Sequence, residues 1–190
     1  MQLSPPAPIL AEDAEQALDV LFGREIIDPV TQPRDRAITK HRVIRDLRLA
    51  YERTQIQPGQ LRRKVDLFVG EHVHTSVDYA IANGVAVQLT QGWSFQGVHV
   101  DSVSEQVKAW AYALRQLRDG LESRVLGAEN WVRPVDPTVD IEVVVTLPTG
   151  VDQRSAYDEA HEVFVQLGAS VRQLQDVDVV ARNAAELLGF

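Results

Sequence analysis

The stretch from Lys64 to Thr90, which reads KVDLFVGEHVHTSVDYAIANGVAVQLT, decides the fold. Apolar and polar residues alternate over 64–69 and again over 72–82, and this period of two is typical of strands that bury one face. The Asn83-Gly84 pair favours a two-residue hairpin turn before a return strand at 85–90, because both residues tolerate positive φ angles. We therefore expect three successive antiparallel strands.

The alternation also predicts the faces and the register of these strands. A two-residue turn places Asp78 opposite Leu89, with Gln88 on the other face. The apolar face carries Val65, Leu67 and Val69 in the first strand and Val73, Val77, Tyr79 and Ile81 in the second, and the polar face of the second strand carries His72, His74, Ser76 and Asp78.

On both sides of these strands the apolar period changes to that of a helix. Helices are expected over 10–22, over 35–55 and over 104–118. The apolar stripe of the second comprises Val43, Ile44, Leu47, Ala50 and Tyr51, and that of the third comprises Val107, Trp110, Ala111, Leu114 and Leu117.

The second half of the chain is predicted to alternate strands and helices. Residues 121–138 contain two prolines and read as irregular. The apolar run over 139–147 is typical of a central strand buried on both faces. A helix over 154–167, a short strand over 169–174 and a final helix beginning near Asp176 complete the chain.

The order of elements is thus α, α, β, β, β, α, β, α, β, α, which indicates an α/β (or α+β) fold. We expect a mixed central sheet of about five strands, with an antiparallel three-strand start, then a parallel βαβ unit, and helices on both faces. Residues 1–33 are expected to form an N-terminal tail and helix, and residues 34–190 a single domain.

Composition excludes several classes of function. The chain has no cysteine, which removes disulfides, thiolate metal sites and cysteine nucleophiles. It contains no G-x-S-x-G, phosphate-binding P-loop or G-x-G-x-x-G motif. No signal peptide and no membrane-spanning run is visible, so we expect a cytoplasmic protein with no membrane partner.

Charge is distributed unevenly along the chain. The net charge is −8, which by itself disfavours nonspecific binding of nucleic acid. Residues 34–64, however, hold ten basic and three acidic residues, a net charge of +7, whereas the remainder holds nine basic and 24 acidic residues, a net charge of −15. This asymmetry indicates a localised basic surface.

The order of elements over 35–147, a helix, three strands with a hairpin, a helix and a further strand, resembles the core of the restriction-endonuclease-like superfamily. Active members place an acidic residue on one strand and an acidic–any–lysine triplet on the next, and together these hold a divalent metal. Asp78 stands at the first position, and the triplet position reads Gln88-Leu89-Thr90. Asp78 and Gln88 are therefore the catalytic candidates, but the second carboxylate and the lysine are missing.

A metal site is the second candidate. His72 and His74 with Asp78 on one strand face offer two imidazoles and a carboxylate, which suit Zn²⁺ or another transition metal. The alternative is a solvated polar face of a half-covered strand. We expect no cofactor, with a divalent metal as the alternative.

The basic segment is the third candidate. Three arginines recur every three residues along one side of the predicted helix, and a basic triplet begins the first strand. Such a surface suits a phosphate backbone, but the same side chains could instead pair with the acidic remainder of the chain or across a dimer. These residues are Arg42, Arg45, Arg48, Arg62, Arg63 and Lys64.

Our hypothesis from the sequence is a non-catalytic binding or regulatory protein on a degenerate nuclease-like core, contacting nucleic acid or a protein partner through the basic helix. One alternative is a metal-dependent nuclease with migrated ligands, using Asp78 with His74 or the Asp140/Glu142 pair. Another is a dimeric interaction module of the antitoxin or immunity type. Whether the chain is an enzyme is left open.

Overall fold

The computed structural model describes residues 37–97 and 100–190. Residues 38–190 form one unit. The helix expected over 10–22 and the tail over 1–33 lie outside the described residues. None of the helices in the described residues is long and apolar enough to cross a membrane.

The described residues form six strands and four α-helices, an α/β fold as predicted. Most of the expected elements are present, with their ends shifted by a few residues. In chain order they are α2 (Lys40–Glu52), β1 (Leu61–Val69), β2 (Val73–Asn83), β3 (Val85–Ser94), α3 (Val100–Arg118), β4 (Ser123–Gly127), β5 (Trp131–Thr146), α4 (Val151–Gln166), β6 (Ser170–Gln173), a 3-10 turn (Leu174–Asp176) and α5 (Val177–Leu187).

All six strands belong to one mixed sheet. Its order is β3-β2-β1-β4-β5-β6, and β3 also pairs with β5. The first three strands are antiparallel, and β5 runs parallel to both β3 and β6, which confirms the predicted antiparallel start and the parallel βαβ unit. Because Val135 of β5 pairs with both Ser123 and Ala86, β1 to β5 close into a ring at this end of the sheet.

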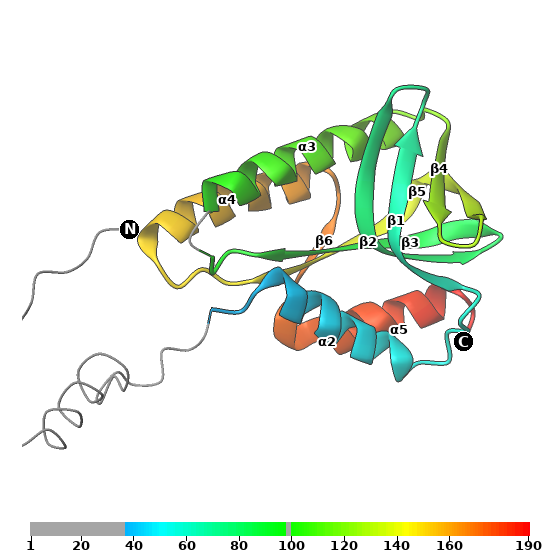
Figure 1. Ribbon diagram of the computed structural model, residues 1–190, viewed down its shortest axis with the longest axis horizontal. Helices are drawn as coiled ribbons and strands as arrows, with labels where there is room; N and C mark the ends of the chain where they lie inside the picture. The colour runs from blue at the N-terminus through cyan, green and yellow to red at the C-terminus, as the bar shows by residue number, and fades with distance from the viewer. Residues whose placement is uncertain (1–36, 98–99) are drawn as a thin grey trace, which may run out of the picture. The chain divides into compact units, whose positions relative to one another are not determined.

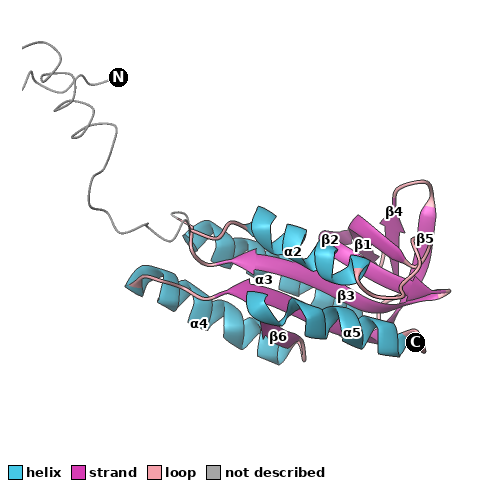
Figure 2. Cartoon of the chain, turned by 90° about the horizontal axis from the view of Figure 1, so that it is seen from below, coloured by secondary structure: helices cyan, strands magenta, loops and turns pink. Residues whose placement is uncertain are grey.

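Helices cover both faces of the sheet, as expected. Helices α3 and α4 lie on one face, and α2 and α5 lie on the other (Figures 1 and 2). The core is divided accordingly. One apolar cluster gathers Leu89, Trp110 and Val143 between the sheet and α3/α4, and a second gathers Val43, Tyr79 and Val180 between the sheet and α2/α5.

The region over 121–138, predicted to be irregular, instead forms β4 and the first half of β5. Glu129 and Asn130 adopt left-handed conformations (φ 59° and 58°) and turn the chain between the two strands. Pro137 is tolerated because it lies where the pairing of β5 with β3 shifts from Val135 to Asp140, so its missing amide hydrogen costs no ladder bond. The sheet therefore has six strands rather than about five.

The predicted register of the hairpin was also wrong. Asn83, not Ala82, pairs with Val85, and Ala82 pairs with Ala86. The register shifts after this pair, so that Ile81 pairs with Gln88. Val87 is the additional residue, a β-bulge in β3. Thr90 consequently lies opposite Tyr79, and the side chains of Gln88 and Thr90 point toward α2.

Val77 and Tyr79 were predicted to share a face but belong to opposite ones. Val77 lies in the α3/α4 cluster, whereas Tyr79 lies in the α2/α5 cluster. The neighbouring strand switches faces at the same level, since Leu61 packs with the second cluster and Val65 with the first. Lys64, with φ 52°, rotates the chain at this point, and alternation in sequence does not reveal such a rotation.

Candidate functional site

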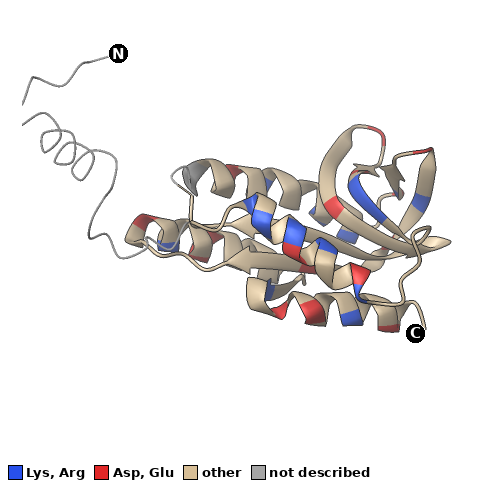
Figure 3. Ribbon diagram, turned by 60° about the horizontal axis from the view of Figure 1, so that its bottom comes forward, with Lys and Arg blue, Asp and Glu red and all other residues tan. Residues whose placement is uncertain are grey.

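Helix α2 is fixed on the sheet by its apolar stripe. Val43 and Leu47 are fully buried, and the hydroxyl of Tyr79 on β2 donates a hydrogen bond of 2.9 Å to the carbonyl of Ile44. The predicted stripe is thus confirmed, with Ile44 at its half-buried edge. On the other side of the helix, Arg42 and Arg45 are exposed and Arg48 is half-exposed. Figure 3 shows where the basic positions lie along α2.

Three arginines of α2 share two carboxylates. Arg42 lies 3.6 Å and Arg45 3.2 Å from Asp46, and Arg48 lies 3.5 Å from Glu52. The arginine side chains remain 54%, 57% and 42% exposed, so these are solvent-screened pairs of small energy. The helix surface therefore keeps a positive excess.

The basic triplet at the start of β1 is divided. The Arg62 guanidinium turns back to donate to the carbonyl oxygens of Pro58 and Leu61, and it lies over the Trp131 ring at 5.7 Å. Arg63 and Lys64 are exposed. The structure thus brings Arg63 to the α2 surface and commits Arg62 to structural contacts.

A hollow of about 240 Å³ lies where α2 meets β1 and β2. We call it the basic pocket, and it is lined by His41, Ile44, Arg45, Arg48, Arg63 and Tyr79. Burial raises the pKa of Tyr79 to about 12, and the opposing charges of Arg63 and Arg48 do not cancel this effect. Tyr79 therefore keeps its proton, and its uncharged side chain forms the floor of the pocket.

Sequence reasoning missed His41 and Tyr79. The spacing of His41, Arg45 and Arg48, at i, i+4 and i+7, places all three on one side of a helix and could have indicated the histidine. Tyr79 could not be found in this way, because its position depends on the change of face near Lys64.

Asp78 and Gln88, the catalytic candidates, belong to separate hydrogen-bond networks. The Asp78 carboxylate accepts the Gly92 amide at 2.9 Å and lies 3.4 Å from the Lys40 ammonium. Gln88 is fully buried, accepts the Tyr51 hydroxyl at 3.0 Å and donates to Asp140 at 3.0 Å. Each side chain has a structural role of its own.

The histidine candidates point into solvent at one end of β2. His72 is 90% exposed beside Glu71, and the His74 ring stacks on Phe68 with centroids 5.8 Å apart. Among residues 37–97 and 100–190, no group of three or more His, Asp or Glu side chains is arranged to hold a metal ion.

The predicted Asp140/Glu142 pair lines a hollow of about 330 Å³ beside α5. Glu142 is almost completely buried, accepts the Asn183 amide at 2.9 Å and lies 3.4 Å from Arg172. Burial raises the pKa of Glu142, although Asn183 and Arg172 both oppose the shift. Asn183 thus satisfies one oxygen of the carboxylate, whereas the other, Oε2, is buried near Arg172 without a hydrogen bond from any described residue.

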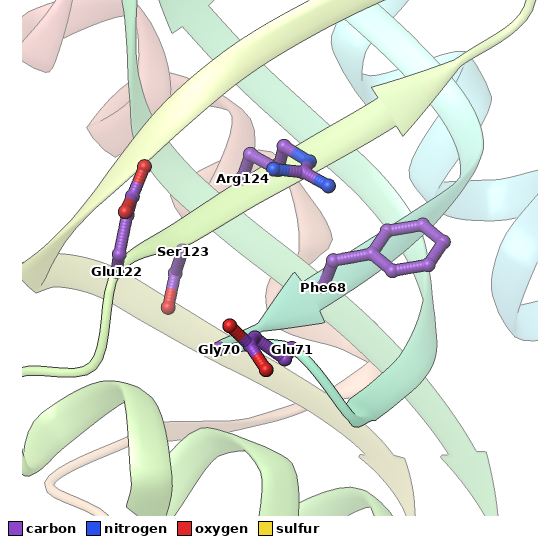
Figure 4. A pocket seen from close by; sticks show the side chains of 6 residues that line it. All are labelled: Phe68, Gly70, Glu71, Glu122, Ser123 and Arg124. Carbon is purple, nitrogen blue, oxygen red and sulfur yellow. The ribbon is translucent and has the colours of Figure 1, made fainter.

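A further hollow, of about 360 Å³, lies at the ends of β1 and β4 (Figure 4). Glu71 and Glu122 lie on either side of Ser123, and Arg124 lies over the Phe68 ring at 5.9 Å. Two carboxylates and one guanidinium give this hollow no positive excess, so it does not extend the basic surface.

No family model, curated protein or solved structure matches the chain. Function is therefore inferred from the charge and geometry of the described residues.

Proposed function

We propose that the protein is a non-catalytic, cytoplasmic nucleic-acid-binding protein that contacts phosphates through one surface. We call this surface the basic face, and it consists of Arg42, Arg45 and Arg48 of α2, Arg63 of β1, which lines the basic pocket, and Lys64, the exposed residue that follows Arg63. The observation that carries the proposal is that, within residues 37–97 and 100–190, these five exposed or half-exposed cations pair with two carboxylates, those of Asp46 and Glu52.

The chemistry of the basic face favours phosphate over a protein partner. Guanidinium groups are weakly hydrated and match phosphate oxygens with two parallel hydrogen bonds. Protein interfaces usually need an apolar or aromatic centre. Among the described residues of α2, the large apolar side chain with substantial exposure is Leu49, at 37%.

The net charge of −8 limits how tightly a polyanion is held. Local phosphate contacts must therefore work against long-range repulsion, which salt screens beyond roughly 10 Å at 0.1 M. We infer modest affinity that depends strongly on salt rather than tight nonspecific binding.

We further propose that the core is a restriction-endonuclease-like one without the catalytic triplet. The order α2-β1-β2-β3-α3, followed after β4 by β5, supports the resemblance. The residues at the catalytic positions differ from those of active members. Gln88 and Thr90 stand where the acid and the lysine would be, and both are hydrogen-bonded to Tyr51. The carboxylate of Asp78 forms an ion pair with the ammonium group of Lys40, 3.4 Å away.

Neutralising the arginines of α2 tests the proposal. The variant Arg42→Gln/Arg45→Gln/Arg48→Gln is expected to bind a labelled single-stranded oligonucleotide about 10- to 100-fold more weakly at low salt, because up to three phosphate contacts are lost. Fluorescence anisotropy measures the affinity, and circular dichroism checks that the variant is folded.

A matched control removes the same charge elsewhere. Arg124, Arg154 and Arg182 are exposed on β4, α4 and α5, and their joint replacement by glutamine should weaken binding by no more than about threefold through net charge. Equal losses in both variants would contradict a localised interface. A change in oligomeric state in the α2 variant alone would instead assign these arginines to a protein contact.

A further inference from the structure

We propose that the basic pocket binds a phosphate monoester, the group found at a phosphorylated strand end. This inference deepens the proposed function and, for the nucleic-acid source of that group, rests on it. The pocket is formed where two elements distant in sequence meet, with His41, Arg45 and Arg48 from α2 and Arg63 from β1.

The donors around the pocket are only partly used within the protein. Arg45 directs its Nε and Nη2 to one oxygen of Asp46, both at 3.2 Å. The Nε of Arg48 is shielded from solvent and lies 3.5 Å from Glu52, so a ligand in the pocket could not reach it. Arg63 is exposed and makes no ion pair with any described residue. Among the guanidinium groups that line the pocket, Arg63 is thus the one that no described carboxylate pairs with.

The size of the pocket fits a phosphate group. Its volume of about 240 Å³ holds a phosphate together with a few water molecules, each of which occupies about 30 Å³. Tyr79 forms the floor of the pocket, and its hydroxyl already donates a hydrogen bond of 2.9 Å to the carbonyl of Ile44. Binding strength must therefore come from the surrounding cations.

A monoester suits this cluster of cations better than a diester. A phosphodiester continues through two ester oxygens, whereas a monoester has one substituent and keeps three oxygens that accept hydrogen bonds. A monoester also carries about 1.5 to 2 negative charges near pH 7, against one for a diester, so it gains more from several converging cations.

A comparison of oligonucleotides that differ only in their end groups tests the inference. Three internally labelled oligonucleotides of one sequence carry a 5′-phosphate, a 3′-phosphate or hydroxyls at both ends. We expect one of the phosphorylated strands to bind about tenfold more tightly than the hydroxyl strand. Arg63→Gln should remove this preference, whereas Arg42→Gln, outside the pocket, should weaken all three strands equally.

The outcomes separate the two proposals. If the three strands bind equally well, the pocket does not take a monoester and the proposed function stands. If no strand binds, the proposed function is wrong, and thermal shift with adenosine monophosphate decides the inference. Stabilisation of the wild type but not of Arg63→Gln would assign the pocket to a small phosphorylated metabolite, and no stabilisation would overturn the inference as well.

Discussion

At the residue scale, the buried polar contacts beneath α2 hold the helix to the sheet. The Tyr51 hydroxyl lies 3.0 Å from the side-chain oxygen of Gln88 and 2.8 Å from that of Thr90. Burial raises the pKa of Tyr51 well above its usual value, so the hydroxyl stays protonated. Gln88 and Thr90, which stand at the positions where the proposed resemblance would place an acid and a lysine, are therefore part of the core.

Removing this hydroxyl should destabilise the protein. Tyr51→Phe leaves Gln88 and Thr90 short of a buried partner, and we expect the free energy of unfolding to fall by about 1–3 kcal/mol. Urea denaturation measures the loss. The control Tyr112→Phe, at a side chain that is 58% exposed, should change stability by no more than about 0.5 kcal/mol. Equal effects would show that the buried contacts contribute nothing.

Glu142 should make stability depend on pH in an unusual direction. Burial, the main cause, raises its pKa above the usual 4.5, so the folded state holds this proton longer than the unfolded state does. The contribution of Glu142 to stability is therefore largest below pH 4.5 and is lost as pH rises through the raised value.

Comparison with Glu142→Gln isolates this contribution, because glutamine does not titrate. Urea denaturation at a series of pH values should show wild type losing stability relative to the variant as pH rises from below 4.5 toward neutrality. A relative gain by wild type over the same range would mean that Arg172 and Asn183 outweigh burial.

At the element scale, the position of α2 depends on a glycine in β3. A Cβ atom at Gly92 would lie 2.9 Å from Cγ1 of Val43, which is fully buried and cannot move freely. Gly92→Ala is therefore expected to cost about 1–3 kcal/mol of stability through overpacking. At Gly59, where nothing lies within 4 Å, the same substitution should have little effect.

A double-mutant cycle identifies the cause. Val43→Ala removes the methyl groups that Gly92→Ala would meet, so the double variant should lose clearly less stability than the two single losses added together. Chemical denaturation of the four proteins gives the coupling energy. If the losses of stability are additive, Val43 of α2 does not pack against Gly92.

Elements with strong local signals could be predicted from the sequence. The stripe of α2 follows from helical period, and a hairpin near Gly84 follows from alternation and turn chemistry, although its register does not. Strand β4 could not, because it has only five residues and charged or half-buried positions interrupt its pattern. The bulge at Val87 and the change of face at Lys64 could not be predicted either, because tertiary packing determines these local backbone conformations.

At the scale of the whole molecule, the direct pairing of β1 with β2 and the packing of α2 on the sheet together assemble the basic pocket. The uneven charge of the sequence predicted that a basic surface would exist. It did not predict that Arg62 would turn away onto Trp131 while Arg63 would join α2, because that choice depends on the packing of β4 and β5.

The salt dependence of nucleic-acid binding tests the central claim most directly. Binding of a labelled single-stranded oligonucleotide is measured by anisotropy between about 25 and 200 mM salt. With three to five cations of the basic face contacting phosphates, log K should fall against log salt with a slope of about −2 to −4. A slope near zero, or no binding at the lowest salt, would contradict the account.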